Sequence, residues 1–215
     1  MDTSKNSHKL SRKYKVNKLS EETVHKNPFI QFEKWFKLVL KLKLKEPNAT
    51  VLATADNIAK PSARVVLMKE ITSKGITFYT NYESRKGEEL LQNPSAALLF
   101  YWAELERQIR IEGKIKKISR LESEKYFNSR PLGSRIAAWA SEQSNKIPDR
   151  EFLEKRFDSF EQKFSDSKIP LPPNWGGYRI IPNYFEFWQG RENRMHDRIS
   201  YEKSKSGWKI FRLAP

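Results

Sequence analysis

The sequence contains no cysteine, which excludes disulfide bonds, thiolate nucleophiles and metal sites built from cysteine. Its three histidines, His8, His25 and His196, stand far apart and show no spacing typical of metal ligands. Neither the G-x-G-x-x-G pattern of a Rossmann nucleotide site nor the G-x-x-x-x-G-K-[ST] pattern of a P-loop occurs. No metal site and no common nucleotide-binding loop is therefore predicted.

Long apolar runs are missing as well. Lysines at positions 37, 41, 43 and 45 interrupt the most apolar stretch, so no segment reaches the length that spans a membrane. The first residues lack the apolar core of a secretory signal. We therefore expect a cytoplasmic protein.

Acidic residues are fewer than basic ones: 26 Asp and Glu stand against 41 Lys and Arg, a formal net charge of +15. This excess favours anionic partners, which include nucleic acid, anionic membranes and phosphorylated small molecules. Charge alone does not choose between them. Nucleic-acid binding is one alternative, because 13% of the residues are aromatic.

The chain of 215 residues is long enough to form one domain with a buried core. Residues 1–27 are polar and basic and are predicted to form a mobile arm, whereas residues 28–215 are predicted to fold. The sequence Trp175-Gly-Gly-Tyr178 predicts a tight turn before a strand.

Short β-branched and aromatic runs between turn residues predict many strands. The predicted strands are residues 50–54, 63–70, 76–80, 96–102, 108–118, 178–181, 185–189, 198–201 and 208–213. The predicted helices are residues 29–40, 84–91, a helix opened by a capping box at 119–122, and 148–164. The pattern is typical of a mainly β fold, a β-barrel or α+β domain with flanking helices.

Basic residues border several apolar or helical segments. Arg64 and Lys69 bracket an apolar run, and Lys86 follows Ser84-Arg85 at a predicted helix N-terminus, where backbone N–H groups favour an anion. Arg130 and Ser134 follow a further predicted helix. Each group alone could be an ordinary surface charge. Their number in one small domain favours phosphate binding.

The segment Phe187–Arg198 is rich in aromatic and basic residues. If its end is an extended strand, Arg194, His196 and Arg198 lie on one face. Two guanidinium groups beside the imidazole would then lower its proton affinity. The alternative is an exposed hairpin end with its charges in water.

Motifs along the chain resemble the pyridoxine/pyridoxamine 5′-phosphate oxidase family, in the order and spacing of that family. In the first half they are Glu46-Pro-Asn-Ala, Leu52-Ala-Thr, Pro61-Ser-Ala-Arg-Val-Val-Leu-Met-Lys69, Phe78-Tyr-Thr-Asn-Tyr-Glu-Ser-Arg-Lys86 and Arg107-Gln-Ile-Arg-Ile-Glu-Gly113. In the second half they are Tyr126-Phe-Asn-Ser-Arg-Pro131, Gln143-Ser144, Trp175-Gly-Gly-Tyr178, Glu186-Phe-Trp-Gln-Gly190, Arg194-Met-His-Asp-Arg198 and Arg212-Leu-Ala-Pro215.

The resemblance implies a split β-barrel that binds FMN at the interface of a homodimer. The residues that it assigns to the flavin are Arg64, Val65, Val66, Leu67, Met68, Lys69, Tyr79, Thr80, Arg85, Lys86, Gln108, Gln143, Ser144, Trp188 and Arg198. The residues that it assigns to the substrate are Tyr14, Lys69, Tyr126, Arg130, Ser134, Arg194, Met195 and His196. Of these, Arg194 and His196 would lie over the pyridine ring as the catalytic pair.

The implied reaction oxidises pyridoxamine or pyridoxine 5′-phosphate to pyridoxal 5′-phosphate, a step of vitamin B6 metabolism, with oxygen as acceptor and hydrogen peroxide as product. The expected partners are these small molecules and a second copy of the chain, with no nucleic acid and no membrane. The chain departs from the family at Ser11, where an Arg is usual, and at Ala59, Arg135 and Ala137. A non-catalytic protein that binds flavin or pyridoxal phosphate on the same barrel is the alternative.

Overall fold

The structure, a computed structural model, describes residues 18–215. The greater part of the predicted arm, with Ser11 and Tyr14, lies outside the described residues. The helices are α1 (Pro28–Lys41), α2 (Arg85–Gln92), α3 (Arg120–Ser129), α4 (Leu132–Ala140) and α5 (Arg150–Lys163), with 3₁₀ turns η3 (Ala103–Leu105) and η4 (Glu192–Arg194). The strands are β1 (Ala49–Ala55), β2 (Pro61–Leu67), β3 (Glu70–Thr72), β4 (Gly75–Asn81), β5 (Ser95–Trp102), β6 (Arg107–Lys117), β7 (Trp175–Gln189), β8 (Asp197–Ser204) and β9 (Gly207–Arg212).

Within residues 18–215, nine strands are joined by hydrogen bonds in one sheet. The order is β2-β1-β5-β6-β7-β4-β3, and β8 pairs with both β7 and β9. The pairs β1–β2, β3–β4, β4–β7, β7–β8 and β8–β9 are antiparallel. The predicted mainly β fold with flanking helices is therefore confirmed. In the described part of the chain, no helix is both long and apolar enough to cross a membrane.

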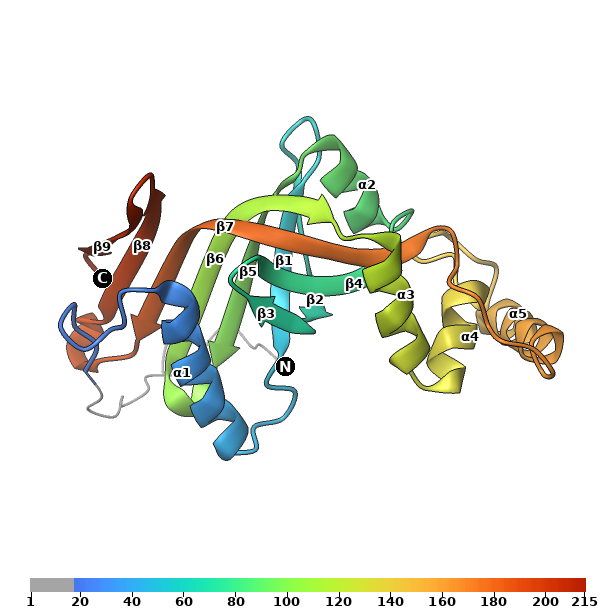
Figure 1. Cartoon of the computed structure of the whole chain (residues 1–215), viewed down its shortest axis with the longest axis horizontal. Helices are drawn as coiled ribbons and strands as arrows, with labels where there is room; N and C mark the ends of the chain where they lie inside the picture. Colours follow the sequence, from blue (N-terminus) through green and yellow to red (C-terminus); the bar gives the residue numbers. More distant parts are fainter. Residues whose placement is uncertain (1–17) are drawn as a thin grey trace, which may run out of the picture. The chain divides into compact units, whose positions relative to one another are not determined.

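The chain divides into two compact units, which we call the terminal unit (residues 18–47, 99–111 and 184–215) and the central unit (residues 48–98 and 112–183). In the terminal unit, Asn27 caps α1 by accepting the N–H of Phe29. The rings of Phe32 and Phe100 meet edge to face at 5.1 Å, and Trp35 meets Phe187 at 5.3 Å. Aromatic contacts thus attach α1 to the strands beside it (Figure 1).

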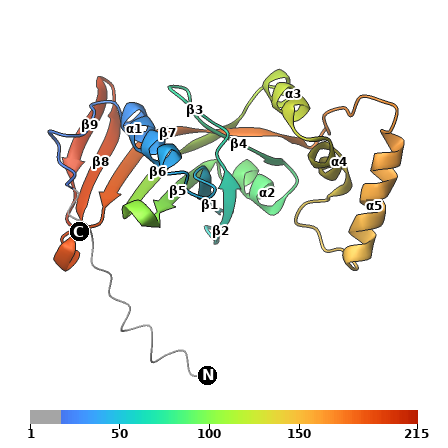
Figure 2. The ribbon, with the colours of Figure 1, turned by 90° about the horizontal axis from the view of Figure 1, so that it is seen from below.

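The central unit carries α2 and the three helices α3, α4 and α5. A capping box opens α3, since Ser119 and Glu122 each accept the other's backbone N–H, as the sequence predicts. Figure 2 shows α4 and α5 side by side, and Trp139 of α4 packs its ring at 5.9 Å from Phe160 of α5. The buried residues Phe127, Ile136, Ile169, Leu171 and Trp175 form one core cluster beneath these helices.

The predicted turn at Trp175-Gly-Gly-Tyr178 is wrong, because these residues begin the continuous strand β7. The glycines are needed for close contacts rather than for a turn. A Cβ on Gly176 would lie 2.2 Å from the hydroxyl of Tyr82, and one on Gly177 would lie 2.5 Å from Ile118. The two strands predicted on either side of Pro182 are also one strand. Because β4 pairs with residues 175–180 and β8 with residues 184–189, the proline lies between the two pairings.

Two further predictions on local structure need correction. The predicted strand 63–70 ends at Leu67, and Lys69 follows it as a linker residue whose N–H donates to Thr77, so Arg64 and Lys69 do not share a strand. This strand is not buried either, since Val65 is 66% exposed. Helix α4 was not predicted. Its N-cap is Pro131, which makes no side-chain cap, so the usual start signal is missing.

Candidate active site

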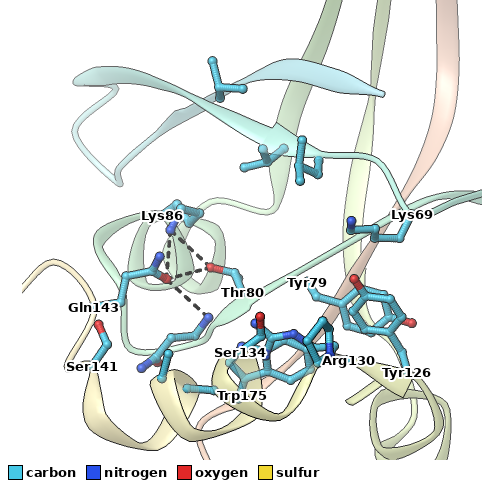
Figure 3. Close-up of a pocket in the computed structure, with 17 residues that line it drawn as sticks. Lys69, Tyr79, Thr80, Lys86, Tyr126, Arg130, Ser134, Ser141, Gln143 and Trp175 are labelled. Carbon is cyan, nitrogen blue, oxygen red and sulfur yellow. Dashed lines mark hydrogen bonds between the residues drawn. The ribbon is translucent and has the colours of Figure 1, made fainter. Parts of the chain in front are cut away.

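A cavity of about 500 Å³ opens in the central unit, between β2, β4 and the helices α2, α3 and α4 (Figure 3). Its lining residues share a basic, amide or aromatic character broken by a few small side chains. They are Val65, Val66, Leu67, Lys69, Tyr79, Thr80, Asn81, Lys86, Tyr126, Arg130, Pro131, Ser134, Ala137, Ala138, Ser141, Gln143 and Trp175. Residues from five separate stretches of the chain therefore meet in one place.

Lys86, on the first turn of α2, forms a polar group at one side of the cavity. It is 8% exposed, and its Nζ donates to Thr80 Oγ1 at 3.2 Å, Ser84 Oγ at 3.1 Å and Gln143 Oε1 at 3.3 Å. Burial, reinforced by the nearby charge of Arg64, lowers the pKa of Lys86 to about 8. The lysine is thus a buried cation whose charge is only partly compensated. Such a group favours an anion.

Arg64 and Arg85 do not line the cavity, and both point to Glu89. The carboxylate of Glu89 accepts Nη2 of Arg64 at 3.0 Å and Nε of Arg85 at 2.9 Å. Arg64 also donates to Leu52 O at 3.2 Å and to the hydroxyls of Thr54 and Ser62. The two arginines are therefore held beside the Lys86 group by a shared carboxylate.

An aromatic wall stands opposite, formed by Tyr79, Tyr126 and Trp175. The rings of Tyr79 and Tyr126 stack at 3.8 Å, and Tyr79 stacks on Trp175 at 5.5 Å. Burial raises the pKa of the Tyr79 hydroxyl to about 12, so it is protonated at neutral pH. The wall offers apolar faces on which a planar ring can stack.

Arg130 follows α3 and lies against this wall. Its guanidinium carbon is 4.7 Å from the centre of the Trp175 ring, and its buried Nη1 has no hydrogen-bond partner among residues 18–215. Burial also lowers the pKa of Arg130, although arginine remains charged at any physiological pH. A buried donor without an acceptor is costly, and a phosphate oxygen would satisfy it. Ser134, on α4, and Lys69 line the same cavity.

The loop after α4 supplies the amide of Gln143. Besides Lys86, its Oε1 accepts Thr80 Oγ1 at 3.0 Å and the N–H of Asn81 at 3.4 Å. The next residue, Ser144, has φ of +79°, a left-handed conformation that is unusual outside glycine. Such backbone strain is commonest at functional sites. The surrounding contacts therefore hold this loop in one conformation beside α2.

Six of the predicted site residues belong to the terminal unit: Gln108, Trp188, Arg194, Met195, His196 and Arg198. Arg198 pairs with the buried Glu186 at 2.8 Å, and Arg110 pairs with the other oxygen of the same carboxylate. The rings of Trp188 and His196 lie 4.7 Å apart. The tryptophan, the imidazole and the Arg198 guanidinium thus occupy positions fixed by neighbouring groups.

The predicted strand face shared by Arg194, His196 and Arg198 is wrong. Strand β8 begins at Asp197, and Arg194 ends the 3₁₀ turn η4 with φ of +59°. The pKa of His196 is lowered as expected, but the main cause is burial, and of the two expected guanidinium groups only that of Arg194 contributes. His196 Nδ1 accepts the N–H of Arg191 at 3.0 Å, which leaves the imidazole proton on Nε2.

The cavity brings together most of the predicted site residues of the central unit. Of the flavin and substrate residues expected in this unit, Arg64, Met68, Arg85 and Ser144 lie outside its lining. Sequence reasoning missed Asn81, Pro131, Ala137, Ala138, Ser141 and Trp175 as lining residues. Trp175 had a signal, an aromatic residue before two glycines, but the glycines suggested a turn.

The donors present suit two anions and a planar ring. Lys86, with Arg64 and Arg85 beside it, offers one anion site, and Arg130 with its unpaired buried N–H offers another. Within residues 18–215, no group of three His, Asp or Glu side chains could hold a metal ion. A ligand with a phosphate and a flat ring system matches the anion site at Lys86. A second phosphorylated ligand matches the anion site at Arg130.

Two family patterns match the chain. The one described as "Pyridoxamine 5′-phosphate oxidase" matches residues 39–164, and the one described as "Pyridoxine 5′-phosphate oxidase C-terminal dimerisation region" matches residues 175–215. Among curated proteins, the "Pyridoxine/pyridoxamine 5′-phosphate oxidase" of Cyanothece sp. is 52% identical over 206 residues, which cover 96% of this chain and 97% of that protein. The protein of the same name from Burkholderia thailandensis is 54% identical over 209 residues, with the same coverage.

Two solved structures show the same fold. PhzG from Burkholderia lata, in complex with tetrahydrophenazine-1-carboxylic acid, has a TM-score of 0.88 and 30% identity, and the match covers 95% of this chain and all of PhzG. A pyridoxamine 5′-phosphate oxidase-related, FMN-binding protein from Nostoc punctiforme has a TM-score of 0.70 and 16% identity, with coverage of 87% and 97%. The split β-barrel that the motifs imply is therefore the fold of this chain.

Proposed function

Because the chain belongs to the pyridoxine/pyridoxamine 5′-phosphate oxidase family, we propose that it oxidises pyridoxamine 5′-phosphate and pyridoxine 5′-phosphate to pyridoxal 5′-phosphate. The proposed cofactor is FMN and the proposed acceptor is oxygen. The observation that carries the proposal is one cavity with two separate anion sites, at Lys86 and at Arg130. A phosphorylated cofactor and a phosphorylated substrate would need both.

The residues around Lys86 fit the phosphate of FMN. Lys86 is a buried cation at the N-terminus of α2, with Arg64 and Arg85 held beside it through Glu89. The exposed apolar side chains of Val65 and Leu67 offer a surface for the flavin ring. When bound there, FMN supplies the hydride acceptor and passes the electrons to oxygen, which yields hydrogen peroxide.

Arg130, Ser134 and Lys69 would bind the substrate phosphate, and Tyr126 would close that side of the cavity. Holding the phosphate fixes the reacting carbon of the substrate at one distance, which lowers the entropic cost of the reaction. The Arg130 guanidinium is already oriented by Trp175, so little freedom is lost on binding.

Arg194 and His196 would contact the pyridine ring. Because the pKa of His196 is lowered and its Nδ1 accepts the Arg191 N–H, a neutral imidazole would present the Nε2 proton as a donor to the ring oxygen. The Arg194 guanidinium would stabilise negative charge on the ring as the hydride leaves. Both residues act by charge and hydrogen bonding, and no nucleophile is required.

A homodimer would bring the flavin residues of the two units together across subunits. The match of residues 175–215 to a dimerisation region supports this proposal. Trp188 and Arg198 lie in that region, so we place them on the partner's flavin.

The test begins with the purified full-length protein. We expect a yellow protein with one FMN per chain that consumes oxygen and forms peroxide when pyridoxamine 5′-phosphate is added. A yellow protein whose flavin is not reduced by that substrate under anaerobic conditions would instead be a non-catalytic binder. A colourless protein that cannot be loaded with FMN would refute the proposal. Tetrahydrophenazine-1-carboxylic acid, which carries no phosphate, serves as the control substrate and should react slowly if at all.

A further inference from the structure

Glu89 is a buried acid in the basic surroundings of the cavity. It lies on α2, three residues after Lys86, and is 6% exposed. Its carboxylate accepts hydrogen bonds from Thr54 Oγ1 at 2.5 Å and Ser62 Oγ at 2.6 Å, besides those from Arg64 and Arg85. Neither the motifs nor the cavity lining points to this residue.

A carboxylate so deeply buried is stable only when it is well paired. Burial alone would raise the pKa of Glu89, but the hydrogen bonds from Ser62, Thr54, Arg85 and Arg64 outweigh it and lower the pKa to about 2. Glu89 is therefore ionised at neutral pH. Its charge joins β1, β2 and α2, because Thr54, Ser62 with Arg64, and Arg85 lie on these three elements.

The four charged side chains at the Lys86 end of the cavity have a net positive charge. Arg64, Arg85 and Lys86 contribute three positive charges and Glu89 one negative charge, which leaves two positive charges. A phosphate monoester carries a charge of about −1.5 to −2 at pH 7. The cluster is thus matched in charge to one phosphate. Without Glu89 it would carry an excess charge, Arg85 would lose its carboxylate partner, and Arg64 would keep only its contacts with Leu52, Thr54 and Ser62.

We propose that Glu89 is a positioning residue that holds Arg64 and Arg85 in place for the phosphate of FMN. The inference rests on the proposed function, since it takes FMN as the ligand. Glu89 itself repels a phosphate, so it acts through the two arginines. Each guanidinium keeps further N–H groups beyond the one that Glu89 engages.

A positioning role and a purely electrostatic role of Glu89 predict opposite changes in FMN affinity when the residue is replaced. If Glu89 acted only through its negative charge, its removal would strengthen the field on the phosphate and tighten FMN binding. If it positions the arginines, its removal takes the carboxylate partner from both guanidinium groups, lets them move and weakens FMN binding. The sign of the change therefore decides between the two.

The experiment compares Glu89→Gln with Glu88→Gln in full-length protein from which flavin has been removed. Glu88 is exposed and adjacent on the same helix, so it loses the same charge without the contacts. FMN and riboflavin are titrated separately, because riboflavin lacks the phosphate. We expect Glu89→Gln to weaken FMN binding at least about tenfold and riboflavin binding less than about twofold, with Glu88→Gln unchanged.

Equal losses for FMN and riboflavin would mean general structural damage and would overturn the inference, as would unchanged or tighter FMN binding. If wild-type protein does not bind FMN at all, the proposed function fails before this question is reached. Should Glu89→Gln not fold, Ser62→Ala removes a donor to Glu89 and an acceptor of Arg64 at a half-buried position, and it leaves every charge in place. We expect Ser62→Ala to weaken FMN binding about threefold, again without effect on riboflavin, and no FMN-selective loss would count against the role.

A second readout is the pH dependence of FMN binding. Around Lys86, the charge of Arg64 lowers the pKa of the amine and the charge of Glu89 raises it. In Glu89→Gln, the pH at which FMN affinity begins to fall should therefore move below its wild-type value. An unshifted midpoint would show that Glu89 is not coupled to the phosphate site.

Discussion

Lys86 and Arg130 line the same cavity, but their surroundings differ. The Nζ of Lys86 donates to three side-chain oxygens, and its neighbours Arg64 and Arg85 share a buried carboxylate. The Nη1 of Arg130 is buried with no hydrogen-bond partner, and its guanidinium rests on the ring of Trp175. The hydrogen-bond donors of Lys86 therefore have partners before any ligand binds, whereas the Nη1 donor of Arg130 has none among the described residues.

The different surroundings of Lys86 and Arg130 suggest that the two cations bind different kinds of ligand. A pre-paired group keeps its geometry when the ligand is absent, which suits a resident cofactor. An unsatisfied donor costs about 1–3 kcal/mol until an acceptor reaches it, so the arrival of a phosphate recovers that free energy. This suits a substrate that comes and goes. Three substitutions and a change of pH test whether the two sites differ in this way.

Arg130→Met should have the largest effect, because it removes a charge-assisted contact at a site with one dominant cation. We expect the KM for pyridoxamine 5′-phosphate to rise about a hundredfold, in line with about 1.5–3 kcal/mol for such a contact. The FMN affinity should stay unchanged. Steady-state kinetics and an FMN titration check both, and a variant that lost FMN while it kept its KM would reverse the assignment of the two sites.

Lys86→Met should weaken FMN binding about tenfold, less than the first change because Arg64 and Arg85 remain beside the site. The KM for substrate, measured with saturating FMN, should not change. Fluorescence titration of flavin-free protein measures the affinity. An increase in KM without loss of FMN affinity would contradict the separation of the two sites.

The pH should affect the two sites differently. Lys86 in the free protein has a pKa of about 8, below the ordinary 10.5, so it is charged below pH 8 and loses its proton above it. FMN affinity should therefore be constant below pH 8 and fall above it by about tenfold in total, the loss expected for Lys86→Met, because a neutral lysine offers the phosphate no charge. Arg130 stays charged throughout, so the substrate KM should show no break near pH 8. FMN titrations and measurements of the substrate KM from pH 6.5 to 9.5 check both expectations.

Trp175→Phe should have the smallest effect. The smaller ring keeps an aromatic face in the core but supports the Arg130 guanidinium less well. We expect the KM for pyridoxamine 5′-phosphate to rise about threefold, with kcat and FMN affinity unchanged. A matching loss at the Lys86 site would mean that the wall supports both groups and that they are not independent.

The motifs were sufficient for the family and for the fold class, and both are confirmed. Most helix and strand positions also followed from local signals, such as the capping box at Ser119 and the helical spacing of apolar residues between Phe29 and Leu40. The roles assigned to individual site residues stay predictions. Where the local signal was ambiguous, as in Trp175-Gly-Gly-Tyr178, the prediction was wrong.

Most short segments could be predicted from the chain's residues, because periodicity, caps and residue type act over a few residues. Which of the basic residues are paired could not, since it depends on the packing of the folded chain. Glu89 meets Thr54 and Arg64 across 35 and 25 residues of chain, and Arg130 meets Trp175 across a longer stretch still. Such pairings depend on how distant segments pack, and a single sequence carries no local signal for them. The same packing left one N–H of Arg130 without an acceptor.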